Sequence, residues 1–254
     1  MINIMRQLKF DALRLVIRNK SFLFFTLLMP EGFYLLFTKV MVVGSGTEMH
    51  QFYMTYMGSM TIYSGVIGAI FGVSTILKRD RDKGLVLFLQ MTPTGSKNYY
   101  ISVYTITVLL NLCAVIVLGL LARLVNNVDL SLKQSAMILL IVLVGQIPMI
   151  LLGTLMSYFK TQETLSVASN LIAFPLAIVS GLWWPINTMP DWLQGIGKVM
   201  PTYFANNLLE KAMLHSQFDL EDIYGIITWI VMMGCLTRLV VKIQQKKGLR
   251  ISEA

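Results

Sequence analysis

The feature that most constrains this chain is a series of long apolar runs, two of which contain no charged residue. The runs Phe52–Leu77 and Tyr99–Ala122 each exceed the roughly 20 residues that an α-helix needs to cross a bilayer. Only 13% of the 254 residues are charged and 56% are apolar, whereas a soluble domain has about 25% charged residues. The runs do not alternate polar and apolar positions as the strands of a membrane barrel do. The sequence therefore predicts an all-α, polytopic membrane protein.

The apolar runs fit one transmembrane domain that occupies residues 1–254. We expect six spans, at residues 22–43, 52–77, 99–122, 135–159, 165–186 and 223–241. Residues 2–20 place apolar and basic side chains on neighbouring arcs of a helix, which predicts an interfacial helix lying flat on the cytoplasmic membrane surface. A plain basic tail that sets the topology is the alternative interpretation of these residues.

The distribution of positive charge predicts the orientation of the spans. Of the 21 Lys and Arg residues, 16 lie in the N-terminal tail, the 78–98 loop, the 160–164 link and the C-terminal tail. Lys and Arg are enriched in cytoplasmic loops, so both termini are expected in the cytoplasm, with the chain in the cell membrane (inner or plasma). Because the charges separate apolar runs, they read as topology signals and do not indicate nucleic acid as a partner.

The chemical motifs of common enzymes are missing from the sequence. It has no glycine-rich P-loop, no HExxH sequence and no suitably placed Ser/His/Asp set. Cys113 and Cys235 fall inside apolar runs and are expected to be packing residues. His50 and His215 have no nearby Cys or His that would complete a ligand set. We therefore expect a chain that is not an enzyme and that holds no cofactor or metal of its own.

Three polar residues inside expected spans are candidates for a transport pathway: Glu31, Gln146 and Asn170. A charge within the hydrocarbon core is costly, so Glu31 should face the helix bundle, a water-filled path or a partner. One interpretation places Glu31 on the pathway. The other makes it a structural carboxyl that is protonated or hydrogen-bonded to a neighbouring helix.

The loop 78–98 combines a basic frame with a short apolar segment. The segment Leu85–Met91 is preceded by Gly84 and followed by Thr92 and Pro93, which leaves room for about two helical turns. A helix of that length cannot span a bilayer. Residues 84–93 are therefore expected to form either a small helix lying on the lipid or a docking element for a cytoplasmic partner protein.

A second unusual segment precedes the last span. Residues 181–208 read GLWWPINTMPDWLQGIGKVMPTYFANNL, with tryptophans suited to a membrane interface and three prolines that break the segment into pieces. Residues 187–213 are thus expected to form short helices at the outer leaflet.

In these two segments the chain resembles the permease subunits of type-2 ABC exporters, a family that includes drug, lipid-linked polysaccharide and antibiotic-resistance exporters. The first segment is similar to the family's cytoplasmic coupling segment, although Leu85 and Leu87 stand where polar residues are common. Its matching residues are Asp82, Lys83, Gly84, Leu89, Thr92 and Pro93. The second is similar to the family's signature before the last span, and its matching residues are Gly181, Pro185, Pro190, Trp192, Leu193, Pro201 and Tyr203. The resemblance covers essentially the whole chain.

The resemblance implies an ATP-driven exporter in which a separate cytoplasmic ATPase subunit binds ATP and Mg²⁺. The ATPase would receive the Leu85–Met91 helix, with the N-terminal helix assisting. The expected coupling residues are Asp82, Lys83, Gly84, Leu85, Phe88, Leu89, Thr92 and Pro93. Because two ATPase subunits close on nucleotide, a dimer of this chain, or a pair with a close relative, is expected in the bilayer.

The first expectation for the cargo is a lipophilic or amphipathic compound, such as a drug, an antibiotic or a lipid-like molecule. A lipid-linked glycan is the alternative cargo. Two other functions stay open: a secondary transporter without an ATPase, and a sensor or immunity protein of the same family that moves no cargo. A secondary transporter would show internal repeats and broken helices near the bilayer midplane, and the sequence has no convincing repeat.

Overall fold

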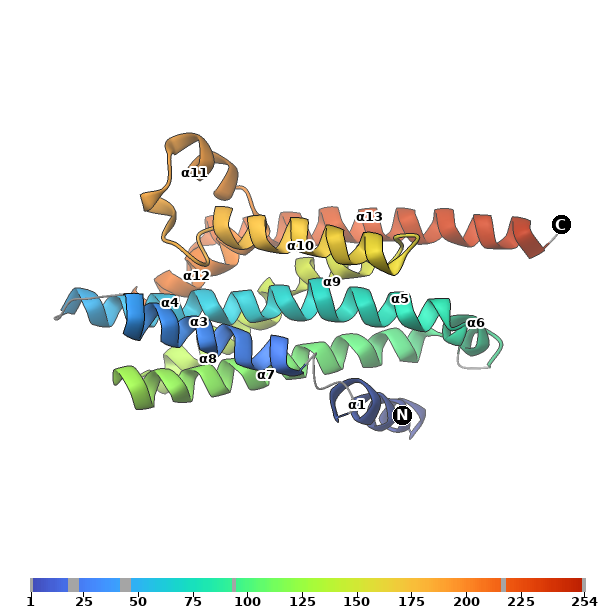
Figure 1. Ribbon diagram of the computed structural model, residues 1–254, viewed down its shortest axis with the longest axis horizontal. Helices are drawn as coiled ribbons and strands as arrows, with labels where there is room; N and C mark the ends of the chain where they lie inside the picture. Colours follow the sequence, from blue (N-terminus) through green and yellow to red (C-terminus); the bar gives the residue numbers. More distant parts are fainter. Residues whose placement is uncertain (1, 18–22, 42–46, 93–94, 216–217, 253–254) are drawn as a thin grey trace.

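The computed structural model describes residues 2–17, 23–41, 47–92, 95–215 and 218–252. Within these ranges the chain is helical and contains no strand. Long helices lie side by side, with α6 and α1 at one end of the bundle and α11 at the other, named here the α6 end and the α11 end (Figure 1). Expected features at Pro93 and at residues 18–20, 22 and 42–43 lie outside the described residues.

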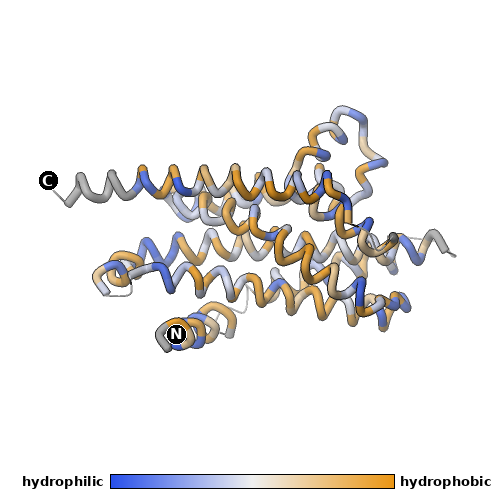
Figure 2. Tube along the Cα trace, turned by 180° about the vertical axis from the view of Figure 1, so that it is seen from behind, coloured by the Kyte–Doolittle hydropathy of each residue, from blue (hydrophilic) through white to orange (hydrophobic). Residues whose placement is uncertain are grey.

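The described chain contains six helices that are long and apolar enough to cross a membrane. This confirms the prediction of an all-α, polytopic membrane protein with six spans. The six comprise η2 (Phe24–Leu28), α3 (Met29–Leu35) and η3 (Leu36–Met41); α4 (Thr47–Ile67), η4 (Gly68–Val73) and α5 (Ser74–Asp82); α7 (Lys97–Asn126); α8 (Leu132–Gly145) and α9 (Ile147–Met156); α10 (Gln162–Val179); and α13 (Leu220–Ser252). Apolar residues predominate along their middle stretches and hydrophilic residues gather toward their ends (Figure 2).

The second of these helices, which runs from α4 through η4 to α5, forms the centre of the bundle. In its most apolar stretch 89% of the residues are buried, compared with 11% for α13. Gly153 of α9 explains part of this close packing, because a Cβ atom there would lie 2.2 Å from the carbonyl oxygen of Ala69 in η4. Small residues allow helix backbones to approach in this way.

Two helical segments at the α6 end lie outside the six candidate spans. The segment α1 (Ile2–Ala12) continues into η1 (Leu13–Ile17) and packs against α7, below which it is drawn in Figure 1. The second segment, α6 (Leu85–Gln90), connects α5 to the turn before α7. Both are therefore held at the same end of the bundle, although α1 and α6 are far apart in the sequence.

The α11 end is built from shorter pieces. Helix α10 ends at Val179, before the expected limit at residue 186, because Gly181 adopts a φ of 81° that a helix cannot contain. The segments η5 (Ile186–Thr188), α11 (Asp191–Gly197) and α12 (Pro201–His215) follow. Helix α12 packs against α4, α8 and α13, whereas α11 projects from the bundle (Figure 1).

Candidate functional site

The strongest candidate site lies at the α6 end, where a glycine separates α5 from α6. Gly84 has a φ of 74°, which glycine adopts without the cost that a side chain imposes. Its amide donates to the carbonyl of Arg81 at 2.9 Å, and its own carbonyl accepts from the amide of Phe88 at 3.0 Å. The chain therefore leaves the α5 direction at this residue and immediately starts a new helix.

Helix α6 has a packed face and an exposed face. Val86 is buried, and Leu85 and Leu89 pack against the same cluster of apolar side chains at the base of α7. The opposite face exposes a set of apolar side chains that we call the exposed row. The row consists of Leu87 (63% exposed), Phe88 (64%) and Met91 (83%). Clustered apolar side chains of this size are characteristic of an interaction site.

The remaining expected coupling residues stabilise the ends of this segment. Asp82 accepts both bonds of Lys78 Nζ at 2.6 Å, and Lys83 is exposed. At the other end, the hydroxyl of Thr92 donates to the carbonyl of Leu89 at 2.6 Å. Asp82 and Thr92 thus shape the ends of the segment, and the exposed row presents its contact surface.

A buried charge cluster joins three helices beside α6; we call it the Asp80 cluster, and its members are Asp11, Arg14, Asp80 and Tyr99. The guanidinium of Arg14 lies 2.8 Å from Asp80 and 3.0 Å from Asp11. The hydroxyl of Tyr99 donates to Asp80 at 2.7 Å. Both carboxylates are buried, so each depends on these partners for the interactions that water would otherwise supply. The cluster ties α1 to α5 and α7.

A second polar contact connects α5 to the link between α9 and α10. Arg81 donates to the backbone carbonyl of Ser157 at 2.8 Å and to its hydroxyl at 3.2 Å. The guanidinium also lies 3.8 Å from the centre of the Tyr158 ring, a cation–π distance. The end of α5, which leads into α6, is therefore held to α1 and α7 by the Asp80 cluster and to the α9–α10 link by Arg81.

A polar cavity of about 270 Å³ opens between α1 and the start of α7. Its lining combines basic, amide and aromatic side chains with one residue of α6. The lining residues are Arg6, Gln7, Phe10, Leu89, Gly95, Asn98 and Tyr99. The α6 end therefore presents an exposed apolar surface, the exposed row, next to a polar cavity.

The three candidate pathway residues occupy different environments. Glu31 is buried on α3, and neither of its carboxylate oxygens has a hydrogen-bond partner among the described residues. Gln146 accepts a bond of 3.1 Å from the amide of Asn111 inside the bundle. Asn170 is exposed on α10, where its amide donates to the carbonyl of Ser166 at 2.8 Å. The structure thus does not bring Gln146 and Asn170 into one site.

The expected outer motif shapes the turns of the α11 end. Gly181 has the positive φ that ends α10, and Pro185 and Pro190 immediately precede η5 and α11. Pro201 is buried at the start of α12, Trp192 is 69% exposed, and Tyr203 lines a polar cavity of about 190 Å³. Trp183 stacks on Phe33 of α3 with 5.1 Å between ring centres. Aromatic packing therefore anchors this motif to the bundle.

Comparison with known proteins identifies the family. The sequence model of the ABC-2 type transporter family matches residues 2–214. The chain belongs to this family. It is also similar to the "Putative transport permease YvfS" of Bacillus subtilis (strain 168), with 29% identity over 202 residues that cover 80% of this chain and 82% of the relative. This ABC-2 transporter chain is accordingly a multi-pass membrane protein of the transport permease type.

Sequence reasoning missed the long-range partners at the α6 end. Asp11 and Arg14 were visible on one stripe of the expected surface helix, but nothing in a single sequence pairs that stripe with Asp80 or pairs Arg81 with Ser157. Leu87, which departs from the family pattern, and Met91 are exposed, whereas the matching Leu89 packs inward. Within the described part of the chain, no cluster of His, Cys, Asp or Glu side chains is placed to hold a metal ion.

Proposed function

We propose that this chain is the permease subunit of an ATP-driven exporter, and that a separate cytoplasmic ATPase subunit drives it through α6. The observation that carries the proposal is the exposed row of Leu87, Phe88 and Met91 on a two-turn helix outside the candidate spans. Covering apolar surface contributes roughly 25 cal/mol per Å². Burying this face in a complementary cleft on a partner would therefore be more favourable than leaving it exposed to water.

The contacts around α6 would allow it to act as a mechanical input. The Asp80 cluster joins α5 to α1 and α7, and Arg81 joins α5 to the link before α10. A force on α6 would thus reach several helices at once. In some proteins buried ion pairs fix a unique geometry, and we propose that role for the Asp80 cluster, because it suits an element that must transmit displacement.

ATP and Mg²⁺ belong, in this proposal, to the partner subunit. Both termini and α6 would face the cytoplasm, in agreement with the concentration of Lys and Arg in the terminal segments and in the 78–98 loop. The membrane would be the cell membrane, inner or plasma. The α11 end would then face the outside, where the proline-interrupted segments η5 and α11 would lie at the outer leaflet.

A second permease copy, or a close relative, would complete the transport unit. Asn170 supports this, because it is an exposed amide on a candidate span, beside the exposed apolar residues Val167 and Leu171. A lipid-facing amide is unfavourable in the hydrocarbon core. A partner helix that covers this face of α10 would supply a polar contact, and the pathway would lie along the resulting interface.

The proposed cargo is a lipophilic or amphipathic compound. Between α10 and α13 the described residues form only η5, α11 and α12 and their links, which favours release of a small molecule over transfer to a large external assembly. Glu31 would line or tune the pathway, because a buried carboxyl without a partner is free to accept a bond from a cargo group. Changing Glu31 to Gln should alter transport of cationic cargo at unchanged expression.

The exposed row provides the test. The tagged full-length chain would be purified from its own cells, and co-purifying proteins with a P-loop sequence would be identified by mass spectrometry. The double variant Leu87→Asp/Phe88→Asp should lose such an ATPase and lose ATP-dependent transport. Leu132→Asp is the matched control, since Leu132 is 90% exposed at the start of α8; it should keep both properties.

Retention of the ATPase and of transport in the double variant would contradict the proposal. Transport driven by an ion gradient, in vesicles that contain no ATPase, would instead support a secondary transporter.

A further inference from the structure

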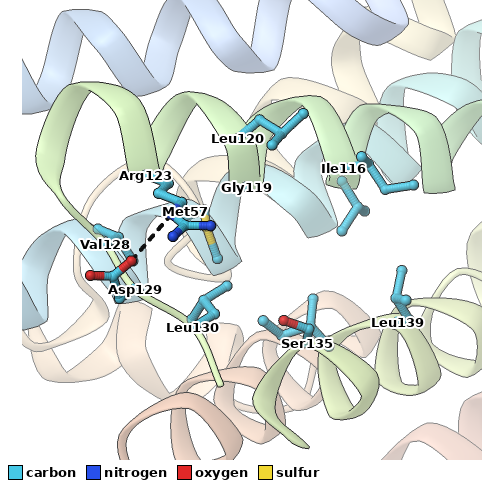
Figure 3. A pocket seen from close by; sticks show the side chains of 12 residues that line it. Met57, Ile116, Gly119, Leu120, Arg123, Val128, Asp129, Leu130, Ser135 and Leu139 are labelled. Carbon is cyan, nitrogen blue, oxygen red and sulfur yellow. Dashed lines mark ion pairs between the residues drawn. The ribbon is translucent and has the colours of Figure 1, made fainter. Parts of the chain in front are cut away.

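Another cavity on the described surface lies away from the coupling site. It has a volume of about 300 Å³ and is bounded by α4, α7, α8 and the segment between α7 and α8. Most of its wall is apolar, as Figure 3 shows from close by. The lining residues are Met57, Val115, Ile116, Gly119, Leu120, Arg123, Val128, Asp129, Leu130, Ser135, Ile138 and Leu139.

A glycine helps to keep this cavity open. A Cβ atom at Gly119 would meet no atom within 4 Å, and Ile116 and Leu120 of the same helix project to either side of it (Figure 3). Leu139 and Ser135 face them from α8. The cavity thus has the shape of a slot between two candidate spans, closed at the back by Met57 of α4.

The two charged groups of this cavity lie together, near the α11 end of α7. Arg123 Nε lies 3.3 Å from Asp129 Oδ1, and the two side chains are 70% and 79% exposed. An ion pair with that exposure contributes little to stability. Both groups remain accessible to a ligand. Arg123 belongs to the last turns of a candidate span, so the pair stands at the level where lipid head groups meet water.

We propose that this cavity binds one membrane phospholipid, with an acyl chain in the slot and a zwitterionic head group at Arg123 and Asp129. The guanidinium would bind the phosphate, and the carboxylate would accept hydrogen bonds from a primary ammonium group, as in phosphatidylethanolamine. The volume lies at the lower limit of small-molecule pockets, roughly 300 Å³, so it accommodates part of one acyl chain and leaves the remainder of the lipid in the bilayer.

The head group must supply the selectivity of such a site. Lipid tails are as apolar as the leucines of the wall, so moving a chain from the bilayer into the slot brings no hydrophobic gain. Charge complementarity then discriminates among lipids. An anionic head group without an ammonium would leave Asp129 unpaired beside a phosphate, and a quaternary ammonium cannot donate a hydrogen bond to the carboxylate.

Native mass spectrometry of the delipidated full-length chain would test the site. Phosphatidylethanolamine, phosphatidylcholine and phosphatidylglycerol would be titrated separately. We expect phosphatidylethanolamine to bind about tenfold more tightly than either of the others. Gly119→Phe should weaken every lipid by filling the slot, and Ser135→Leu should act in the same direction from α8. Asp129→Asn should remove the preference for phosphatidylethanolamine.

Gly234→Phe on α13 is the matched control, because a Cβ at Gly234 also meets no atom within 4 Å and Gly234 does not line the cavity. It should bind like the wild-type chain. Retained helical circular dichroism and a monodisperse elution profile would show that the filled variants are folded. Equal binding of the three lipids by the wild-type chain would overturn the proposal, as would unchanged binding by folded Gly119→Phe and Ser135→Leu.

Discussion

Charged side chains at the two ends of the bundle reach partners at different distances along the sequence. At the α6 end, the polar contacts join segments far apart in the sequence: Arg81 and Ser157 are 76 residues apart, and Arg14 of η1 pairs with Asp80 of α5. At the α11 end, the pairs of Lys211 with Asp219 and Asp222 span only 8 and 11 residues and join α12 to the next helix, α13. The long-range contacts of the α11 end are neutral: Gln134 donates to the carbonyl of Met213, Asn126 donates to the hydroxyl of Tyr34, and Trp183 stacks on Phe33.

Because of this difference, we expect the two ends to respond differently to a displacement. A displacement of the α6 end cannot remain local, because its buried charges connect α1, α5, α7 and the link before α10. At the α11 end the ion pairs join consecutive helices, and the contacts between distant segments are neutral hydrogen bonds and ring contacts, each of which contributes less than a charge-assisted bond. The first arrangement suits an input that moves the bundle, and the second suits a region that opens.

The largest expected effect comes from breaking the Asp80 cluster. Asp80→Asn removes the carboxylate that pairs with Arg14 and accepts from Tyr99. Loss of one member of a buried pair should lower the free energy of unfolding by about 3 kcal/mol. Thermal unfolding of the purified chain would measure this loss.

The double variant Arg14→Gln/Asp80→Asn serves as the control for Asp80→Asn. It should lose less than the sum of the two single variants, because each single variant already removes the Arg14–Asp80 contact, which the double variant loses only once. Additive losses would contradict the coupling between α1 and α5.

The next effect concerns the contact of Arg81 with the α9–α10 link. Arg81→Gln removes two charge-assisted donors and the contact with the Tyr158 ring. A loss of about 1.5–3 kcal/mol is expected, together with reduced stimulation of ATP hydrolysis by cargo. Arg79→Gln is the matched control, because Arg79 makes only a 3.6 Å contact with Asp80 and is partly exposed. Equal effects of Arg81→Gln and Arg79→Gln would contradict the proposal that the α9–α10 link transmits the movement of α5.

The α11 end offers a comparable test on one short helix. A Cβ atom at Gly197 would lie 2.1 Å from the carbonyl of Val179, whereas one at Gly195 would meet nothing within 4 Å. Gly197→Ala should therefore destabilise the chain by about 1–3 kcal/mol through overpacking, and Gly195→Ala should not. Co-purification of the ATPase should be unaffected by either change, and its loss in Gly197→Ala would show that the two ends are not separable.

The smallest expected effect is the removal of a partly exposed ion pair, between Lys211 and Asp219, by Asp219→Asn. The hydrogen bond from Lys211 lowers the pKa of Asp219 below its ordinary value. Its contribution to stability is therefore present above the unfolded pKa of about 4 and is lost as the pH falls through the lower folded pKa. The difference in melting temperature between wild type and Asp219→Asn should be small at pH 7 and absent at strongly acidic pH. A difference that persists in acid would contradict this assignment.

Much of this fold could be predicted from the sequence because lipid imposes a length and a composition on every span. Runs such as Phe52–Leu77 can satisfy their backbone groups only as helices. Gly84 and Gly181 likewise mark turns through their own backbone freedom. The length of α10 was less predictable, because apolar side chains continue beyond Val179 although the helix does not.

The position of the candidate site in the chain could be predicted from the sequence, but the residues that it contacts could not. The short apolar segment between Gly84 and Pro93 identified α6, yet which of its faces points outward depends on the packing of Val86 and Leu89 against an apolar cluster that η1, α5 and α7 share. The partners of Asp80 and Arg81 come from the other end of the chain or from another loop, and no periodicity encodes such pairs. Only the folded structure shows that these contacts connect the segments at the α6 end to one another.

Cross-linking from α6 tests the central claim most directly. In a chain with Cys113 and Cys235 replaced by Ser, single cysteines would be placed at Phe88, on the exposed row, and at Val86, on the buried face. The account predicts that Phe88→Cys cross-links to an ATP-hydrolysing subunit and that Val86→Cys does not. Modification of Phe88→Cys by a lipid-confined reagent, with no adduct to an ATPase, would contradict it.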